Sequence, residues 1–278
     1  MSWAGGAFGE HAECVLAPNA NIMTLDGTNT WILRDPASRR SVVVDPGPLD
    51  EGHLDRVAEA AGDVAVVLLT HHHLDHSEAA RFFAGRVGAG VRALDPAYRL
   101  GGEGLADGDV VTVGDLEIRV IGTPGHTSDS LSFLVPRDGA VLTGDTVLGR
   151  GTTVVAHPDG QLGAYLDSLD RLHALAEAHE ARTIWPGHGP VIDDALAALD
   201  YYRAHRRERL AQVEAAVLAL SGEPTLGKAL VHLDLDAGSG ANLTPQTVVE
   251  RVYADVDPVL WGAAELSVRA QLAYLAGR

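Results

Sequence analysis

The sequence predicts an α+β fold: a layered domain of strands and helices, followed by a helical subdomain. Short apolar runs bounded by glycine turns alternate with segments of helical spacing in the first part of the chain. Four of the predicted strands end in a loop that carries histidine or aspartate. The last part of the chain has helical spacing only. We therefore expect a layered domain over residues 1–195 and a helical subdomain over residues 196–278.

The first elements are predicted to be two strands, a helix and a buried strand. "TNTWILRD" alternates apolar and polar residues, and "SVVVDPGP" is an apolar run that stops at Asp-Pro-Gly. "HLDRVAEAAG" has helical spacing at Leu54, Val57 and Ala61, with Gly62 as its predicted end. "VAVVLLT" is a continuous run of Val and Leu that stops at Thr70, which is typical of a buried strand.

Three further strand ends follow, each with a histidine or an aspartate. A helix, "SEAARFFAG", is predicted directly after a histidine-rich loop. "DLEIRVIGTPGHTSDS" is a strand that runs into a loop with His126, and "LSFLVPRDGAVLTGDTVLG" predicts two strands, the second ending at Asp145. After the amphipathic helix "LGAYLDSLDRLHALAE", "ARTIWPGHGPVI" predicts a strand before His188. In a layered fold such loops lie together at one edge of the sheets, where sites are usually built.

The C-terminal part begins with one long helix, predicted over Ala195–Ser221. Arg203 and Arg206 fall on the same spacing as its apolar residues and interrupt the apolar stripe. Shorter helices are predicted after it, and Thr225 and Thr244 are their expected N-caps. The arginines of the long helix form a possible basic patch, for which a solvated helix face is the favoured alternative.

The composition limits the classes of function. The single cysteine, Cys14, excludes an intramolecular disulfide framework and a Cys-rich zinc module, and we expect it in the core. No apolar run reaches the ~20 residues of a membrane span, and the N-terminal sequence lacks a signal-peptide pattern. We therefore expect a cytoplasmic protein with no membrane partner. The net charge of −17 disfavours binding to a nucleic-acid backbone.

The loop "LLTHHHLDHSEAA" holds the candidate metal ligands. Imidazole and carboxylate groups without thiolate suit zinc, and also manganese or iron. His71 and His73 are two residues apart, so an extended loop can direct both rings at one ion. Asp75 and His76 are adjacent and must point differently, which suits a second ion about 3.5–4 Å from the first. A solvated loop without an ion does not explain why three further motifs occupy strand ends.

These motifs resemble the metallo-β-lactamase superfamily. The set "THHHLDH", "TPGHTSDS", "TGDTVLG" and "WPGHGP" carries the resemblance, and "GDTVLGRGTTVV" with "YYRAHRRERLAQV" is similar to the β-lactamase-like protein 2 branch. The resemblance implies a four-layer αβ/βα sandwich with the site at one edge. It also implies a winged-helix-like C-terminal subdomain. Because the sequence ends at "YLAGR", we expect the wing of that subdomain to be missing or shortened.

The resemblance also implies that seven side chains hold two divalent ions, which we expect to be zinc. Those implied for the first ion are His71, His73 and His126. Those implied for the second ion are Asp75, His76 and His188, with Asp145 as the bridge. His72 is the variable position of the motif and is expected not to be a ligand. Asp45 is expected to orient a ligand histidine, and a simple turn aspartate is an equal alternative.

Three functions are open at this point. The first is a hydrolase of a small ester, thioester or lactone, in which Asp75 accepts a proton from the attacking water. The second is a single-stranded RNA endonuclease, which the β-lactamase-like protein 2 branch suggests. The third is a non-catalytic binding module. The net charge favours the small-molecule hydrolase, with His157 and Tyr202 as candidates for the pocket wall. The sequence does not fix the oligomeric state.

Overall fold

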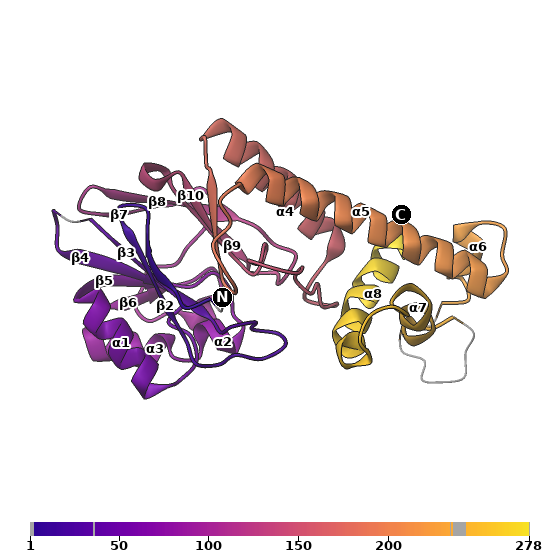
Figure 1. The fold of residues 1–278 in the computed structure, drawn as a ribbon, viewed down its shortest axis with the longest axis horizontal. Coiled ribbons are helices and arrows are strands. Elements are labelled where there is room, and N and C mark those ends of the chain that lie inside the picture. Colours follow the sequence, from indigo (N-terminus) through magenta and orange to yellow (C-terminus); the bar gives the residue numbers. More distant parts are fainter. Residues whose placement is uncertain (1–2, 36, 234, 236–242, 278) are drawn as a thin grey trace.

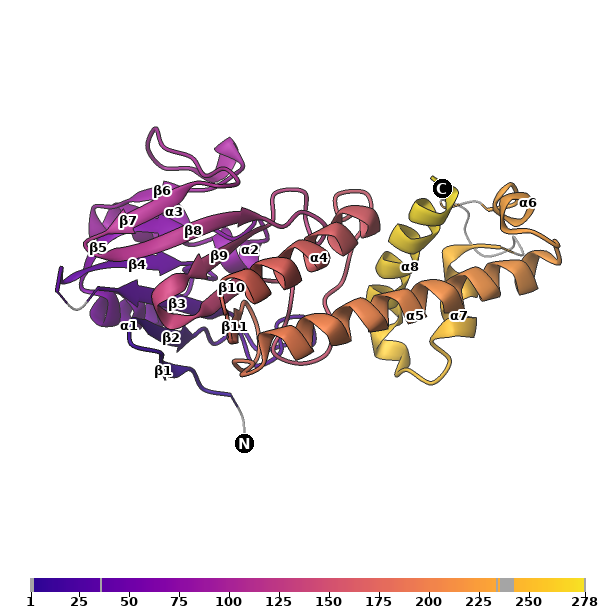
Figure 2. The ribbon, with the colours of Figure 1, turned by 90° about the horizontal axis from the view of Figure 1, so that it is seen from above.

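The computed structural model describes residues 3–35, 37–233, 235 and 243–277. Two sheets pack face to face, and helices cover the outer face of each (Figure 1). This is the predicted four-layer sandwich. A helical part follows and extends to one side of the sandwich, joined to it by one long helix (Figure 2). None of the described helices has the length and apolar character that crossing a membrane requires.

The first sheet has six strands in the order β1-β2-β3-β4-β5-β6. Their bounds are Gly6–Phe8, Ala12–Leu16, Asn29–Arg34, Arg40–Val44, Asp63–Leu68 and Gly90–Arg92. The pairs from β1 to β4 are antiparallel, whereas β4, β5 and β6 run parallel. Helices α1 (Glu51–Ala61) and α3 (Ala80–Val87) cover its outer face, where Leu54, Val57 and Phe83 are fully buried. As predicted, α1 ends at Gly62.

The second sheet has five strands in the order β11-β10-β9-β8-β7. Their bounds, in chain order from β7, are Val110–Val113, Leu116–Gly122, Leu131–Val135, Ala140–Gly144 and Thr183–Pro186. Its outer face packs against α4 (Leu162–Ala178) and the first half of α5 (Ala195–Ser221). Between the two sheets lies the main core, in which the rings of Trp31 and Trp185 stack at 5.2 Å. Cys14 is buried in this core, as expected.

The helical part consists of the second half of α5 and four short elements. These are α6 (Leu226–Leu230), α7 (Pro245–Val252), the 3-10 turn η3 (Pro258–Leu260) and α8 (Trp261–Ala276). Thr244 caps α7 with its side chain, whereas the Thr225 side chain makes no capping hydrogen bond to α6. Over the described residues of this part no strand follows β11, and part of the segment "TLGKALVHLDLD" lies outside the described residues.

The histidine loop differs from the prediction in one respect. A single helix was expected after it, but the chain forms a short helix α2 (Leu74–Ser77) and then α3. The Ser77 hydroxyl donates to the carbonyl of His72 at 2.8 Å, which ties the short helix to the loop before it. Because of this turn, Asp75 and His76 lie on helical backbone, whereas His71 and His73 lie on the extended loop.

Candidate metal centre

Seven histidine and aspartate side chains meet at one edge of the sandwich, each delivered by a strand end or by α2. His71 and His73 follow β5, and Asp75 and His76 lie on α2. Loops after β8, β10 and β11 supply the other three, which are His126, Asp145 and His188. The structure thus brings together all seven side chains that the resemblance implied. They form three overlapping groups that could hold a metal ion.

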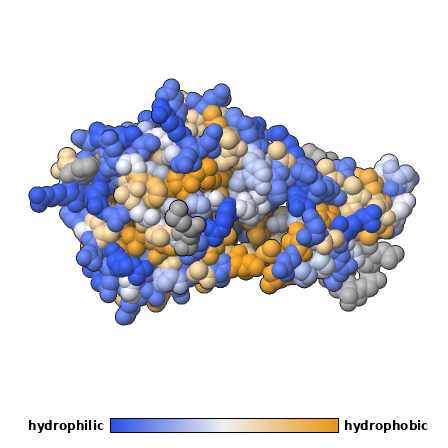
Figure 3. Space-filling view, in the orientation of Figure 1, coloured by the Kyte–Doolittle hydropathy of each residue, from blue (hydrophilic) through white to orange (hydrophobic). Residues whose placement is uncertain are grey.

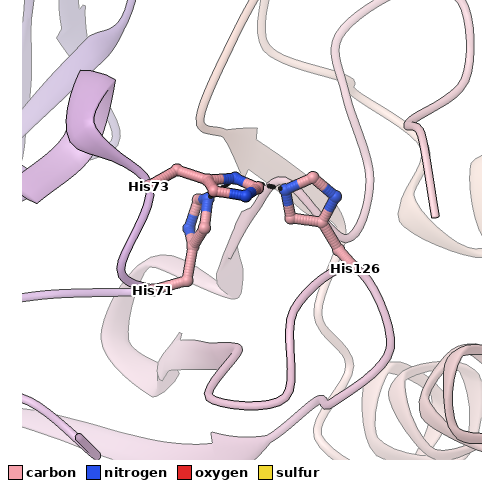
Figure 4. A group of neighbouring side chains, drawn as sticks. All are labelled: His71, His73 and His126. Carbon is pink, nitrogen blue, oxygen red and sulfur yellow. Dashed lines mark hydrogen bonds between the residues drawn. The ribbon is translucent and has the colours of Figure 1, made fainter. Parts of the chain in front are cut away.

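The first group is His71, His73 and His126, whose ring nitrogens converge on one point (Figure 4). His73 Nδ1 lies 3.1 Å from His71 Nε2 and 3.0 Å from His126 Nε2. The rings meet edge to face. Three imidazole nitrogens at such spacing provide the donor set of a three-histidine metal site.

The second group is Asp75, His76 and His188. His76 Nε2 lies 3.2 Å from His188 Nε2, and Asp75 Oδ2 lies 3.1 Å from the same His188 nitrogen. Both histidines are buried, whereas the Asp75 side chain is 30% exposed. This group therefore has one carboxylate within reach of solvent.

Asp145 lies between the two groups. Its Oδ2 is 3.4 Å from His188 Nε2 and 3.8 Å from His126 Nε2, so one oxygen contacts both groups. Its Oδ1 is buried, lies 3.4 Å from His76 Nε2 and has no hydrogen-bond partner. An ionised buried oxygen without a partner is costly, and a cation held among these donors would satisfy it. The residues present therefore fit a pair of metal ions.

Four of the five ligand-type histidines, His71, His76, His126 and His188, are held through the ring nitrogen that faces away from the centre. The Asp45 carboxylate lies 2.9 Å from His76 Nδ1 and accepts the Thr70 hydroxyl, which in turn contacts His71 Nδ1 at 3.0 Å. His126 Nδ1 lies 2.7 Å from the carbonyl of Val154. Such contacts fix the ring orientation and the tautomer. Asp45 also has a positive φ of 51°, a conformation that its three hydrogen bonds maintain.

Gly187, in the loop before His188, leaves space for the centre. A Cβ atom there would lie 2.4 Å from Asp145 Oδ1 and 2.8 Å from His76 Cε1. His188 is held by the carbonyl of Gly27 through its Nδ1 at 3.1 Å. The motif "PGHGP" therefore needs its first glycine for close approach of the backbone to the donors.

The three histidines of the first group are neutral at pH 7. Burial, together with the adjacent His126 ring, lowers the pKa of His73 to about 4. Burial is also the main cause that lowers the pKa of His71 and of His126. Neutral imidazole is the form that binds metal, so this group is ready to bind without losing a proton.

In the second group, the attraction between carboxylates and histidines shifts the pKa values more than burial does. Burial alone would lower the pKa of His188, but Asp145 raises it to about 9. Burial alone would raise the pKa of Asp75, but His76 and His188 lower it to about 2. The carboxylates also raise the pKa of His76. At pH 7 these donors therefore carry opposite charges, which attract one another.

The remaining residues of the motif point elsewhere. His72 turns away from the centre, and its Nδ1 lies 2.8 Å from Asp129 Oδ1. Asp129 also accepts the Thr127 hydroxyl at 2.8 Å, and Thr127 contacts the Ser130 hydroxyl at 2.7 Å. These bonds brace the loop that carries His126.

A cavity of about 470 Å³ opens beside the centre, between the sandwich and the helical part. His126 and Asp145 reach its wall from the centre, and most other lining residues are apolar. They include Ile22, Met23, Leu148, Tyr253, Val256 and Leu260. Figure 3 shows hydrophobic surface where the two parts of the molecule meet, at the lower edge of the view. The helical part thus closes one side of the space in front of the donors.

Neither candidate for the pocket wall lines this cavity. His157 is half-buried outside it. Tyr202 is buried beneath it: the hydroxyl accepts the Leu148 amide at 2.8 Å and contacts the carbonyl of Gly151 at 3.2 Å. Leu148 and Gly151 do line the cavity. Tyr202 therefore supports the wall from behind.

The arginines of α5 do not form one basic patch. Arg203 is paired with Asp170 at 2.5 Å and Asp200 at 3.1 Å. Arg206 is buried, and Arg209 packs over the Tyr253 ring at 4.7 Å. Sequence reasoning missed that Arg206 and Arg209 face the cavity, because the helical spacing alone does not reveal what packs against it. For Arg206, its place on the apolar stripe was the available signal.

Comparison with known proteins gives two family matches. The family described as "Metallo-beta-lactamase superfamily" matches residues 23–188. The family described as "Beta-lactamase associated winged helix domain" matches residues 244–277, which hold α7 and α8.

Among curated proteins, the chain is similar to an atrochrysone carboxyl ACP thioesterase of Aspergillus fumigatus. The two are 34% identical over 205 residues, which are 70% of this chain and 62% of that protein. A beta-lactamase-like protein 2 homolog of Drosophila melanogaster is 28% identical over 280 residues, covering 94% of this chain and 86% of the relative. The chain thus spans less than two thirds of the thioesterase and most of the second protein.

Solved structures share the fold over the whole chain. A beta-lactamase domain protein from Burkholderia ambifaria matches with a TM-score of 0.73, covering 100% of this chain and 91% of that one at 22% identity. A metallo-beta-lactamase family protein from Thermus thermophilus matches with a TM-score of 0.71, over 96% and 93% of the two chains, also at 22% identity. Both likenesses extend over the helical part as well as the sandwich.

Proposed function

The chain belongs to the metallo-beta-lactamase superfamily, and from this premise we propose that it is a dinuclear-metal hydrolase of a small ester, thioester or lactone. The observation that carries the proposal is the pair of donor groups joined by Asp145 beside a mostly apolar cavity. The similarity to an ACP thioesterase supports an acyl substrate.

We assign the ligands by donor group. His71, His73 and His126 would hold the first ion, and Asp75, His76 and His188 would hold the second. Asp145, which lies between the groups, would contribute its carboxylate to both. We propose zinc, because the donors are imidazole and carboxylate only; manganese and iron accept the same donors.

Two such ions supply an acidified water as nucleophile at neutral pH and polarise the scissile carbonyl. The chain's own residues orient the reactants. Asp75 is ionised at neutral pH and partly exposed. We therefore propose that its carboxylate would accept a proton from the attacking water. The apolar wall around Leu148 and Val256 holds the acyl part and excludes water from it.

RNA is a weaker candidate on this structure. The net charge of −17 opposes an RNA backbone. Of the arginines that would bind it, Arg203 is paired with acidic residues and Arg206 is buried. Arg207 is exposed and lies 4.0 Å from Asp170. A small-molecule substrate is therefore the partner that we propose.

The test combines metal content with turnover on zinc-reconstituted protein. We expect about two zinc ions per chain, and hydrolysis of 4-nitrophenyl esters or of acyl thioesters of N-acetylcysteamine. His188→Ala should keep the first ion. His71 belongs to two of the donor groups, so His71→Ala should weaken the binding of both ions. His72→Ala is the matched control and should keep both ions. One ion per chain under metal-replete conditions, or RNA cleavage without acyl hydrolysis, would contradict the proposal.

A further inference from the structure

Arg206 is a buried cation without an acidic partner. The residue is 4% exposed, and its Nε has no hydrogen-bond partner. Over the described part of the chain, no carboxylate forms an ion pair with its guanidinium. Its known contacts are the Thr153 carbonyl, which accepts from Nη2 at 2.5 Å, and the Tyr165 ring, 4.9 Å from Cζ. Both contacts are to uncharged groups.

Among the described residues, none that contacts Arg206 supplies the missing negative charge. Burial raises the pKa of the Tyr165 hydroxyl, although Arg206 lowers it, so this hydroxyl is neutral at pH 7. Arginine keeps its charge in proteins, and a buried charge without a partner is costly. Arg203, one turn earlier on the same helix, has two aspartate partners. Arg206 thus lacks the acidic partners that Arg203 has on the same helix.

Arg206 lies at the wall of an open cavity. Arg206 and Arg209 both line the cavity that also contains His126 and Asp145. Arg209 stacks on Tyr253 and donates to the side-chain oxygen of Gln212 at 2.9 Å, so its partners are uncharged too. A third arginine of the wall, Arg150, is paired with Asp26. Two cations of this cavity thus lack a counter-charge, and both come from α5.

A purely structural role does not account for Arg206. Its bond to Thr153 does brace the segment next to Val154, whose carbonyl holds His126. A neutral glutamine could brace a carbonyl in the same way without burying a charge. A structural role therefore does not explain why Arg206 is charged, or why its Nε has no hydrogen-bond partner although the residue lines a cavity.

We propose that Arg206 and Arg209 form a subsite for an anionic oxygen group of the substrate, a carboxylate or a phosphate. This inference rests on the proposed function. It deepens that function: the substrate has an apolar body that fits the cavity wall and an anion remote from the scissile bond. Guanidinium groups bind carboxylates and phosphates through paired hydrogen bonds. The anion would sit at the α5 side of the cavity while the acyl carbon faces the metal centre.

The anion can belong to either half of the substrate, and paired substrates distinguish the two sources. The first pair is the 4-nitrophenyl monoester of a dicarboxylic acid and the ester of the monocarboxylic acid of equal chain length, over a series of lengths. The second pair is an acyl thioester of phosphopantetheine and the same thioester of N-acetylcysteamine. In one of the two pairs we expect the anionic member to have a kcat/KM about 10- to 100-fold higher, as for hydrogen bonds to charged groups.

Arg206→Gln and Arg209→Gln should each reduce that preference about tenfold or more, mainly through KM. Arg207→Gln removes an exposed arginine of the same helix and should leave the preference unchanged. If Arg206→Gln melts without a cooperative transition, Arg209→Gln carries the test. Equal kcat/KM for the members of both pairs in the wild-type protein would overturn the inference.

A binding measurement separates this inference from the proposed function. Calorimetry on zinc-loaded protein compares a dicarboxylate with the monocarboxylate of equal length, and an alkyl phosphate with the corresponding alcohol. Tighter binding of the anion that is lost in Arg206→Gln or Arg209→Gln supports the subsite, even if no ester or thioester is hydrolysed. Hydrolysis of acyl substrates with no arginine-dependent binding overturns the subsite and leaves the hydrolase in place.

Discussion

The two polar walls of the cavity are built on opposite principles. At the metal centre, His71, His126 and His188 are each held through the ring nitrogen that faces away from the centre, and His126 and His188 also lie near the Asp145 carboxylate. On α5, Arg206 and Arg209 have only uncharged partners. The first wall, the metal donors, consists of groups that bind a cation. The second wall, Arg206 and Arg209, consists of cations that can bind an anion.

This difference teaches how to separate the roles of charged residues in one cavity. A donor set with opposite charges within 3–4 Å is nearly balanced by the chain itself, as Asp75 and His188 are at 3.1 Å. An arginine whose charge is not balanced depends on something outside the chain. We therefore expect different effects at the two walls. Substitution of a metal donor should remove metal and turnover, whereas substitution of Arg206 or Arg209 should remove the preference for anionic over neutral substrates.

The largest effect is expected at the residue that joins the two metal groups. Asp145→Ala should reduce kcat by on the order of 10³-fold or more, because it removes the oxygen that contacts both groups. Its melt should stay cooperative, since Asp145 lies in a loop at the sheet edge. Steady-state kinetics and calorimetric melting measure the two effects.

Asp35→Ala is the matched control for Asp145→Ala. Asp35 is equally buried, but its carboxylate accepts the backbone amides of Ala37 and Asp115, away from the metal centre. We expect it to lower the melting temperature while the remaining folded protein keeps its turnover. Unchanged turnover in Asp145→Ala would remove the central difference between the two walls.

A smaller effect is expected behind the metal donors. Asp45→Asn should weaken metal binding about 10- to 100-fold, because the amide holds the His76 ring less well than the carboxylate at 2.9 Å. Competition with a chelator measures the affinity. Asp138→Asn is the matched control, since its carboxylate lies 2.9 Å from the Nδ1 of His11, which is not among the metal donors. Equal affinity in the two variants would show that support from behind does not distinguish the metal wall.

Local sequence patterns predicted the strand ends that carry the candidate donors, whereas the four-layer sandwich and the full ligand set were implied by the resemblance to the superfamily. Strand periodicity placed His126, Asp145 and His188 at strand ends, and parallel strand ends share an edge. The sequence also pointed to Asp45, but it left open whether this residue orients a histidine or only forms a turn. The contact with His76 decides between the two, and only the folded structure brings these residues together.

The cavity wall opposite the metal centre could not be predicted in the same way. Of its residues, Tyr253 and Val256 lie in the turn between α7 and η3, and Leu260 is the last residue of η3; these segments carry no motif. Arg206 was expected on an exposed helix face, either a basic patch or, preferably, a solvated face, although its position on the apolar stripe indicates the burial that the structure shows. Charge on a helix predicts exposure only when its neighbours in space are polar, and those neighbours come from residues distant in the sequence, such as Thr153 and Tyr165.

The smallest effect is expected at the support between the two walls. Tyr202→Phe removes the hydroxyl that accepts the buried Leu148 amide at 2.8 Å. An amide left without a partner costs about 1–3 kcal/mol, which lowers the melting temperature of a domain of this size by roughly 2–4 °C per kcal/mol. Because Leu148 lines the cavity and is not a metal donor, KM should rise by a few fold while metal content stays at the wild-type value. Tyr201→Phe, at the exposed neighbouring position, should change neither melting temperature nor KM. Loss of metal in Tyr202→Phe would mean that the two walls are coupled through the segment after β10, and that the separate roles drawn for them do not hold.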